Sequence, residues 1–306
     1  MNLFSAVKKN TQIGVDFLPG GVAVAQVSTA KKSIGKITRS EYLPAVGQVA
    51  QIQALQGWVR KNHLEKTACV CLIASDDYDV YQIDKPNVEE AELNSALTWS
   101  IKDLISYEVA SAVVDSYPLP VSNKNNTQQI SVVCAHESTV GSYVEGIKST
   151  GLTLAAIDIH NLVSKNLASV HQGEGGTHAI LSLDEQSGVL SIFHDTDLYV
   201  SRDFKIGIDQ IKQASSEDES AYDSLLLEIQ RSMDYFENYF GIGSVSSLSV
   251  FPQLPETVKM VKYLQNFTSF DIDFVVPVEG TNADSKSTLE THFFHAYCAA
   301  LRGTAQ

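Results

Sequence analysis

The N-terminal pattern that governs this chain's architecture is Ile13-Gly14-Val15-Asp16-Phe17-Leu18-Pro19-Gly20-Gly21-Val22-Ala23-Val24-Ala25-Gln26-Val27. Apolar residues alternate on both sides of a Pro-Gly-Gly turn, which indicates two antiparallel strands joined by a tight bend. Asp16 stands near the end of the first strand, and Gly20 and Gly21 form the bend. Glycine lets a backbone come close to a bound phosphate, so this hairpin is a candidate phosphate loop, although most such hairpins only turn the chain.

A second hairpin of the same kind opens the C-terminal half of the chain. Each half then continues with a third strand, a helix and a further strand, and this repeated order predicts two ribonuclease-H-like subdomains facing each other across a cleft. The expected elements of the first half are strands in 11–28, 34–42 and 68–74 and a helix over 49–62; those of the second are strands 177–183, 189–194, 198–204, 245–251 and 270–276 and helices over 222–240 and 255–266.

An additional unit interrupts the first half after Ser75. Its expected order is β-α-β-β-α-β, with a helix over 87–106 and a strand over 109–117, which is typical of a small α+β subdomain. The resulting division has a first lobe (1–75 and 159–177, with a C-terminal helix over 288–306), an inserted subdomain (76–158) and a second lobe (178–287).

Composition narrows the range of partners. The chain has 306 residues, 44% of them hydrophobic, and a formal net charge of -14. An acidic protein is repelled by nucleic acid and by anionic lipid, so we expect no nucleic-acid partner and no direct membrane insertion. No apolar run is long enough to span a membrane, and the first ten residues lack the apolar core of a signal peptide.

The spacing of the cysteines and histidines in the sequence predicts neither a metal site nor a disulfide framework. The four cysteines, of which Cys69 and Cys71 share one face of a strand, form no C-x-x-C pair and are expected to be small buried residues in a reducing compartment. His292 and His295 are three residues apart on an expected helix and could offer two nitrogens, but no third ligand lies nearby in sequence, so core or surface histidines are expected.

Several motifs together resemble the PilM family of type IV pilus assembly proteins, within it most closely the branch that serves MSHA pili. The resemblance covers nearly the whole chain, and Glu228-Ile229-Gln230-Arg231-Ser232, which is similar to the family's Glu-Ile-x-Arg-Ser helix, is its most specific part. The other matching segments are 13–16, 107–108 with 114–120, 152–158, 190–194 and 299–303.

This resemblance implies an actin-like ATPase fold, α/β in class, with an inserted α+β subdomain of the FtsA type. It also implies a cytoplasmic scaffold recruited to the face of the inner membrane. The implied partner is a PilN-like bitopic inner-membrane protein, bound through its short cytoplasmic N-terminal segment, together with other pilus assembly components.

The first two phosphate loops of such a fold are degenerate in this chain. After Asp16 the family's glycine and serines are replaced by Phe17-Leu18-Pro19, and proline removes a backbone donor. In the second loop the expected Asp-Ile-Gly-x-Thr-Thr reads Ser182-Leu183-Asp184-Glu185-Gln186-Ser187. Phosphate binding needs neutral donors and a carboxylate for Mg²⁺, whereas Asp184 and Glu185 would repel phosphate. The remaining candidate cofactor residues are Asp16, Gly20, Gly21, Ser182, Asp184 and Ser187.

The third loop, Val250-Phe251-Pro252, has bulky residues in place of a Gly-Gly pair. Three altered loops predict a pseudo-ATPase with no catalytic residues, no required cofactor, and at most weak binding of ATP and Mg²⁺. Two alternatives stay open. One is an actin-like ATPase or a sugar-kinase-like enzyme, which would need an intact second loop. The other is an FtsA-like cell-division tether, which would need a C-terminal amphipathic helix that 302–306 does not supply.

If nucleotide chemistry is absent, the groove between the inserted subdomain and the first lobe is the expected partner site. Two rigid walls can desolvate a short extended peptide between them. We expect helix 87–106 and strand 109–117 to form one wall, and the chain's negative charge to favour a basic segment.

Overall fold

The structure is a computed structural model that describes residues 10–30, 35–121, 128–171, 176–214, 218–275 and 291–303. Parts of the expected C-terminal helix, 288–290 and 304–306, lie outside these residues, as do 276–287 at the end of the expected second lobe. The described residues form three sheets, and no described helix is long and apolar enough to cross a membrane.

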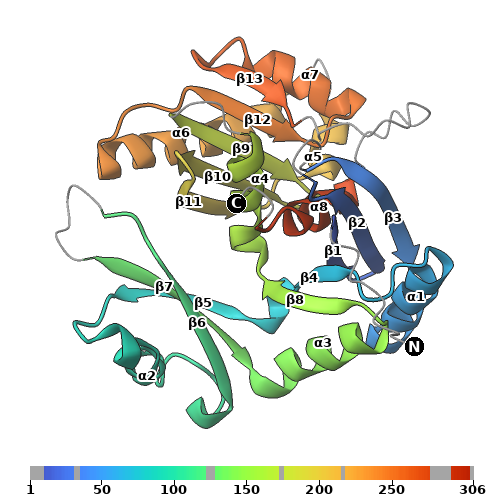
Figure 1. Cartoon of the computed structure of the whole chain (residues 1–306). Helices are drawn as coiled ribbons and strands as arrows, with labels where there is room; N and C mark the ends of the chain where they lie inside the picture. The colour runs from blue at the N-terminus through green and yellow to red at the C-terminus, as the bar shows by residue number, and fades with distance from the viewer. Residues whose placement is uncertain are drawn as a thin grey trace, which may run out of the picture.

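The first sheet has the strand order β3-β2-β1-β4-β8, drawn mainly in blue in Figure 1. Alternation places one set of side chains, including Ile13 and Val15, against α1 and α3, and the other set against α4 and α8. The elements are β1 (Thr11–Leu18), β2 (Gly21–Ser28), β3 (Ile37–Pro44), β4 (Ala68–Leu72) and β8 (Thr153–Asp158), with α1 (Gln48–Lys61), α3 (Glu137–Ser149), α4 (His160–His171) and α8 (Phe294–Ala300).

The second sheet repeats this order as β11-β10-β9-β12-β13, which confirms the expected duplication. Helices α5, α6 and α7 pack on one face around the buried stripe predicted for α6. Gly241 ends α6 with a left-handed φ of 67°, a conformation that glycine adopts readily. The elements are β9 (Thr177–Leu183), β10 (Gly188–His194), β11 (Asp197–Phe204), β12 (Ser247–Phe251), β13 (Asp271–Phe274), α5 (Ile208–Gln213), α6 (Ser220–Phe240) and α7 (Pro255–Leu264).

A third, three-stranded sheet of order β5-β7-β6 forms the inserted unit, at the lower left of Figure 1. Its small core joins Leu93 and Leu97 of α2 to Ile130 and Val132 of β7. The elements are β5 (Asp79–Asp84), α2 (Glu90–Ser100), β6 (Ala112–Pro118) and β7 (Gln129–His136), with one-turn helices η1 (Ser75–Asp77), η2 (Val109–Ser111) and, near the C-terminus, η3 (Thr291–Phe293).

Two expectations about this unit are wrong in detail. We assigned 76–158 to it, but β8 pairs in parallel with β4 in the first sheet, and Tyr143 and Ile147 of α3 are buried in the core of the first lobe. The order β-α-β-β-α-β is correct, but β8 extends a different sheet. Helix α2 is also shorter than 87–106, because regular helical hydrogen bonding ends near Ile101.

A middle layer joins the two lobes. Helices α4 and α8 lie between the first and second sheets in Figure 1, and their buried side chains contact both. Val70 and Leu72 come from the first sheet, and Phe193 and Phe251 come from the second. Helix α8, which lies within the C-terminal helix expected for the first lobe, packs against β1 and β2.

Candidate functional site

The close approach of α8 to β1 depends on Gly14. A Cβ atom at this position would lie 1.8 Å from the backbone oxygen of Ala296, so only glycine allows the helix to cross the strand here. Asp16 follows two residues later on the same face of the strand. The crossing therefore brings His295 of α8 next to the Asp16 carboxylate.

The parallel pairing of β1, β4 and β8 supplies a third side chain. Asp16 is paired with Leu72, and Leu72 is paired with Asp158, so all three lie in one row at the carboxyl edge of the sheet. The chain turns directly after Asp158 into α4, whose first residue is His160. His160, which follows β8, therefore lies beside Asp16 at the end of β1.

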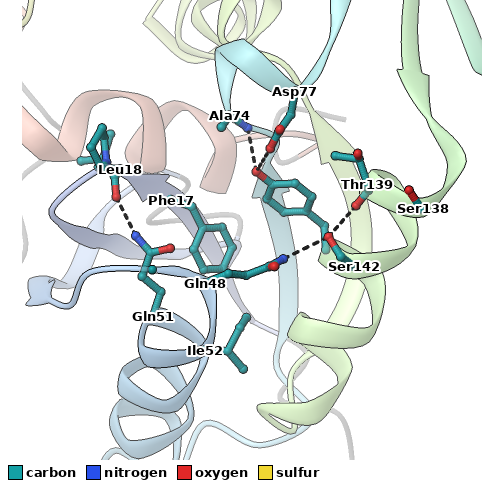
Figure 2. Close-up of a pocket in the computed structure, with 13 residues that line it drawn as sticks. Phe17, Leu18, Gln48, Gln51, Ile52, Ala74, Asp77, Ser138, Thr139 and Ser142 are labelled. Carbon is teal, nitrogen blue, oxygen red and sulfur yellow. Dashed lines mark hydrogen bonds between the residues drawn. The ribbon is translucent and has the colours of Figure 1, made fainter. Parts of the chain in front are cut away.

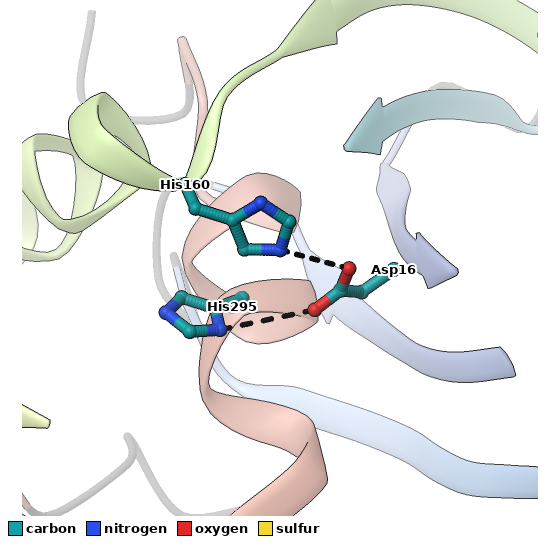
Figure 3. Close-up of side chains that lie close together, drawn as sticks. All are labelled: Asp16, His160 and His295. Carbon is teal, nitrogen blue, oxygen red and sulfur yellow. Dashed lines mark hydrogen bonds and ion pairs between the residues drawn. The ribbon is translucent and has the colours of Figure 1, made fainter. Parts of the chain in front are cut away.

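Asp16, His160 and His295 form a compact cluster (Figure 3). His160 Nε2 lies 3.0 Å from Asp16 Oδ1, and His295 Nδ1 lies 3.8 Å from Asp16 Oδ2. The Asp16 side chain is only 1% exposed, and no described residue hydrogen-bonds to its Oδ2. The two imidazole rings meet edge to face, with centroids 4.8 Å apart.

The cluster shifts the acidity of all three groups. Burial alone would raise the pKa of Asp16, but the charge and hydrogen bond of His160, with the charge of His295, lower it. Burial alone would lower the pKa of His160, but Asp16, Asp184 and Asp158 raise it. The pKa of His295 is lowered by burial and by the neighbouring His160. His160 is therefore the imidazole that carries a proton most readily.

The glycines of the first turn lie apart from this cluster. A Cβ atom on Gly21 would lie 2.6 Å from the Leu43 carbonyl oxygen, so the turn is pressed against β3. Gln51 Nε2 donates to the carbonyls of Leu18 and Gly21, at 2.6 and 3.1 Å. These contacts account for Gly20 and Gly21 as elements of hairpin packing.

The second turn is closed by its own lobe. The amides of Ile208 and Asp209, in the first turn of α5, donate to the carbonyls of Asp184 and Glu185. Inside the turn, the Asp184 amide donates to the Ser187 carbonyl at 2.8 Å. These amides are thus already paired within the protein. Ser182 is buried on β9, and Ser187 is paired through its carbonyl with the Asp184 amide. The charge of Asp184 acts to raise the pKa of both His160 and His295.

The third loop is filled by aromatic rings. Phe251 is 2% exposed and stacks on Phe294 of α8, with centroids 4.8 Å apart. The Pro252 carbonyl accepts a hydrogen bond from Thr257 Oγ1 at 2.7 Å. These side chains fill the place where the family resemblance predicts a glycine pair that would bind the adenine base.

A groove of about 520 Å³ opens on the other face of β1 (Figure 2). Its walls are the first turns of α1 and α3, and the end of β1 and the segment after β4 close it. Gln48 Nε2 donates to Ser142 Oγ across it at 3.0 Å. The lining residues that matter below are Phe17, Pro19, Ile52, Asp77, Thr139 and Tyr143.

Tyr143 fixes the inner end of this groove. Its hydroxyl donates to Asp77 Oδ2 at 2.6 Å and accepts from the Ala74 amide at 3.1 Å. Its ring meets that of Phe17 edge to face, at 5.7 Å between centroids. Neither α2 nor β6, the expected wall of the partner site, lines this groove, because α2 packs on β7 in the small core of the third sheet.

The sequence contains no signal for His160, and it predicts His295 as a core or surface histidine without its contact to Asp16. His292, paired with His295 by spacing, instead stacks on Tyr42 at 4.7 Å between centroids. His295 lies beside Asp16, which is distant in sequence. The two residues meet only because α8 crosses β1 at Gly14. To find this contact from the sequence, one would have to predict that α8 packs on β1. The four cysteines are buried and free, as expected.

Comparison with known proteins identifies the fold. No protein-family model matches the chain, and no curated protein matches it in sequence. Among solved structures, the "PilM-PilN type IV pilus biogenesis complex" is similar over 96% of this chain and 98% of that one, with a TM-score of 0.67 and 13% identity. A Bacteroides thetaiotaomicron protein of actin-like ATPase fold and unknown function is similar over 92% and 96%, with a TM-score of 0.50 and 12% identity. The chain therefore has the actin-like fold, as predicted.

Proposed function

We propose that this chain is a PilM-like, non-enzymatic scaffold of type IV pilus assembly, of the MSHA branch. In this role it binds the cytoplasmic N-terminal segment of a PilN-like bitopic inner-membrane protein. That partner recruits it from the cytoplasm to the inner membrane, where it meets other assembly components. The observation that carries the proposal is the similarity to the PilM–PilN complex over nearly the full length of both chains.

The groove between α1 and α3 is the proposed peptide site. It offers the apolar side chains of Phe17 and Ile52 beside polar groups from the first turn of α3. Val46 and Val49, next to the groove-lining Gly47 and Gln48, are 81% and 73% exposed and add apolar surface at its edge. An extended segment can bury apolar side chains here and pair its backbone with the polar rim.

Charge favours a basic segment. Asp77 is the charged residue of the groove lining, and the chain carries a net charge of -14. The cytoplasmic flank of a bitopic inner-membrane protein is typically rich in lysine and arginine. Such a segment is attracted to this surface, although ordering it on binding limits the affinity.

The absence of ATPase activity is part of the proposal. The carboxylate of Asp16 is buried against His160, which leaves it poorly placed to position a hydrated Mg²⁺ beside a phosphate. The amides at the start of α5 and the space beside β12 are occupied by protein groups. We expect no Mg-ATP turnover and no micromolar binding in calorimetry. Saturable micromolar binding with phosphate release would contradict this part.

The peptide site is tested with a synthetic cytoplasmic N-terminal segment of the proposed PilN-like partner. Thr139→Trp fills the groove and should weaken binding to the full-length protein at least tenfold, measured by fluorescence anisotropy. Asn94→Trp, an exposed position on α2, is the matched control and should bind normally. Equal affinity of the Thr139→Trp variant and the unaltered protein would place the peptide elsewhere.

A further inference from the structure

We propose that Asp16, His160 and His295 form a binding site for one divalent transition-metal ion, with zinc as the representative ion. Each side chain offers one ligand atom, and these three atoms all lie within 4.8 Å of one another. A tetrahedral zinc ion bound at about 2.0–2.2 Å holds its nitrogen and oxygen ligands roughly 3.4 Å apart. His295 Nδ1 lies 3.8 Å from Asp16 Oδ2, close to that value, and His160 Nε2 lies 3.0 Å from Oδ1 of the same carboxylate. This proposal replaces the expectation, drawn from spacing alone, that no metal binds here.

The unpaired oxygen of Asp16 is the first independent support. Asp16 Oδ2 is buried and hydrogen-bonds to no described residue, and 3.8 Å to His295 Nδ1 is too long for a hydrogen bond. A buried carboxylate oxygen without a partner costs free energy, because it has lost its water and gained nothing. An ion between the carboxylate and the imidazoles would satisfy this oxygen.

The surroundings of His160 give the second support. Its Nε2 faces Asp16, while its Nδ1 lies 3.5 Å from Ser75 Oγ, within reach of a hydrogen bond to that hydroxyl. Metal-binding histidines usually donate their second N–H to such an outer group, which fixes the tautomer and aims the other nitrogen at the metal. Ser75 is therefore a positioning residue for the proposed site.

The local charge also calls for a cation. Asp184 acts electrostatically on both imidazoles in addition to Asp16. Asp158, the other nearby carboxylate, is paired with Arg302 at 2.8 Å. One bound divalent ion would offset the negative charge of Asp16 and Asp184, and water could complete its coordination.

The ligand types select the kind of ion. Imidazole nitrogen suits zinc, iron, nickel and copper, whereas magnesium prefers an octahedron of oxygen ligands. Two imidazoles and one carboxylate thus favour zinc-like ions over Mg²⁺. Because the ligands come from β1, α4 and α8, the ion would join the first sheet directly to the middle layer between the lobes.

The test uses the full-length protein, stripped with a chelator and titrated with ZnCl₂, CoCl₂ or MgCl₂. We expect one zinc per chain in calorimetry, with a dissociation constant of about 1 μM or tighter, a rise in melting temperature, and Co²⁺ absorption bands of a low-symmetry nitrogen-oxygen site. No effect is expected from Mg²⁺. Absence of zinc binding at millimolar concentration would overturn the proposal, whatever the outcome of the peptide experiment.

Variants distinguish this site from adventitious zinc at surface histidines. His295→Gln should weaken zinc binding at least tenfold, and Ser75→Ala about tenfold, with loss or change of the Co²⁺ bands. His292→Gln, three residues earlier and outside the cluster, is the matched control and should bind as the unaltered protein does. If His295→Gln is unstable, the Co²⁺ spectrum of Ser75→Ala still decides. Equal zinc affinity and spectra in Ser75→Ala and the unaltered protein would then overturn the proposal.

Discussion

The two large sheets have the same strand order but treat equivalent positions differently. Asp16 is the partner of Leu72 at the end of β4, and Ser182 is the partner of Phe251 at the end of β12. By the same register Gly14 corresponds to Ile180. In the first sheet a glycine lets a helix come close and a buried carboxylate meets two imidazoles. In the second an isoleucine fills the space and a serine ends the row.

The difference teaches that the duplicated topology positions a site without specifying its chemistry. Parallel strands end at a common edge in both lobes, so side chains gather there in both. In the first lobe this edge holds a charged cluster with an unpaired oxygen. In the second lobe the turn is closed by amides from α5. The predictions below test this contrast.

The largest effect is expected from Gly14→Ala. The added Cβ atom would overlap the Ala296 backbone, and α8 would have to move away from the sheet. We expect a loss of about 3 kcal/mol in the free energy of unfolding, measured by urea denaturation. Gly57→Ala, on the exposed face of α1 with open space around it, is the control and should stabilise the protein by up to about 1 kcal/mol. Equal stability of both variants would show that α8 does not depend on Gly14.

The next largest effect is expected from a comparison of Asp16 with Ser182, the equivalent residue of the second sheet. Asp16→Asn keeps the shape but removes the charge that pairs with His160, and we expect a loss of about 2 kcal/mol at neutral pH without added metal. Ser182→Ala should change stability by less than about 0.5 kcal/mol. A larger loss from Ser182→Ala than from Asp16→Asn would reverse the comparison.

The smallest effect is a contrast in pH dependence within the cluster, measured in chelator. Burial opposes the charge of His160, but Asp16, Asp184 and Asp158 raise its pKa above 6.5. Its stabilising contribution is therefore complete below pH 6.5 and is lost as the pH rises through the folded-state value. Burial and His160 lower the pKa of His295, so that residue destabilises the fold as the pH falls below 6.5.

The two glutamine variants should consequently respond in opposite directions. Relative to the unaltered protein, His160→Gln should lose more stability at about pH 5.5 than at pH 8, and His295→Gln should lose less at pH 5.5 than at pH 8. The expected differences are on the order of 1 kcal/mol in the free energy of unfolding. Parallel pH profiles for both variants would mean that the two imidazoles share one environment.

The sequence predicts most of the fold because its signals are local. The hairpin at 13–27, the stripe of α6 and the stop at Gly241 each depend on neighbours within a few residues. The boundary of the inserted unit was misplaced because the apolar pattern of 153–158 predicts a strand without saying which sheet it joins. Its parallel pairing with β4 depends on the position of the whole sheet.

The candidate site was less accessible for the same reason. Asp16 was identified from its place at the end of a strand, but its partners are distant in sequence. His295 reaches it only because Gly14 admits α8, and His160 only because β8 ends in the same row as Asp16. The groove that the structure shows lies between α1 and α3, and neither α2 nor β6 lines it, since α3 packs on the first lobe and not in the core of the third sheet.

The two proposed sites lie on opposite faces of strand β1. Its even-numbered residues, from Gln12 to Asp16, face the middle layer and the cluster; its odd-numbered residues, from Ile13 to Phe17, face the core and the groove. Neighbouring residues of β1 therefore contribute to different sites. Phe17 is the odd-numbered residue of β1 that lines the groove, so a substitution there would act on the proposed peptide site and leave Asp16 on the opposite face unchanged, whereas a single inserted or deleted residue in β1 would damage both sites at once.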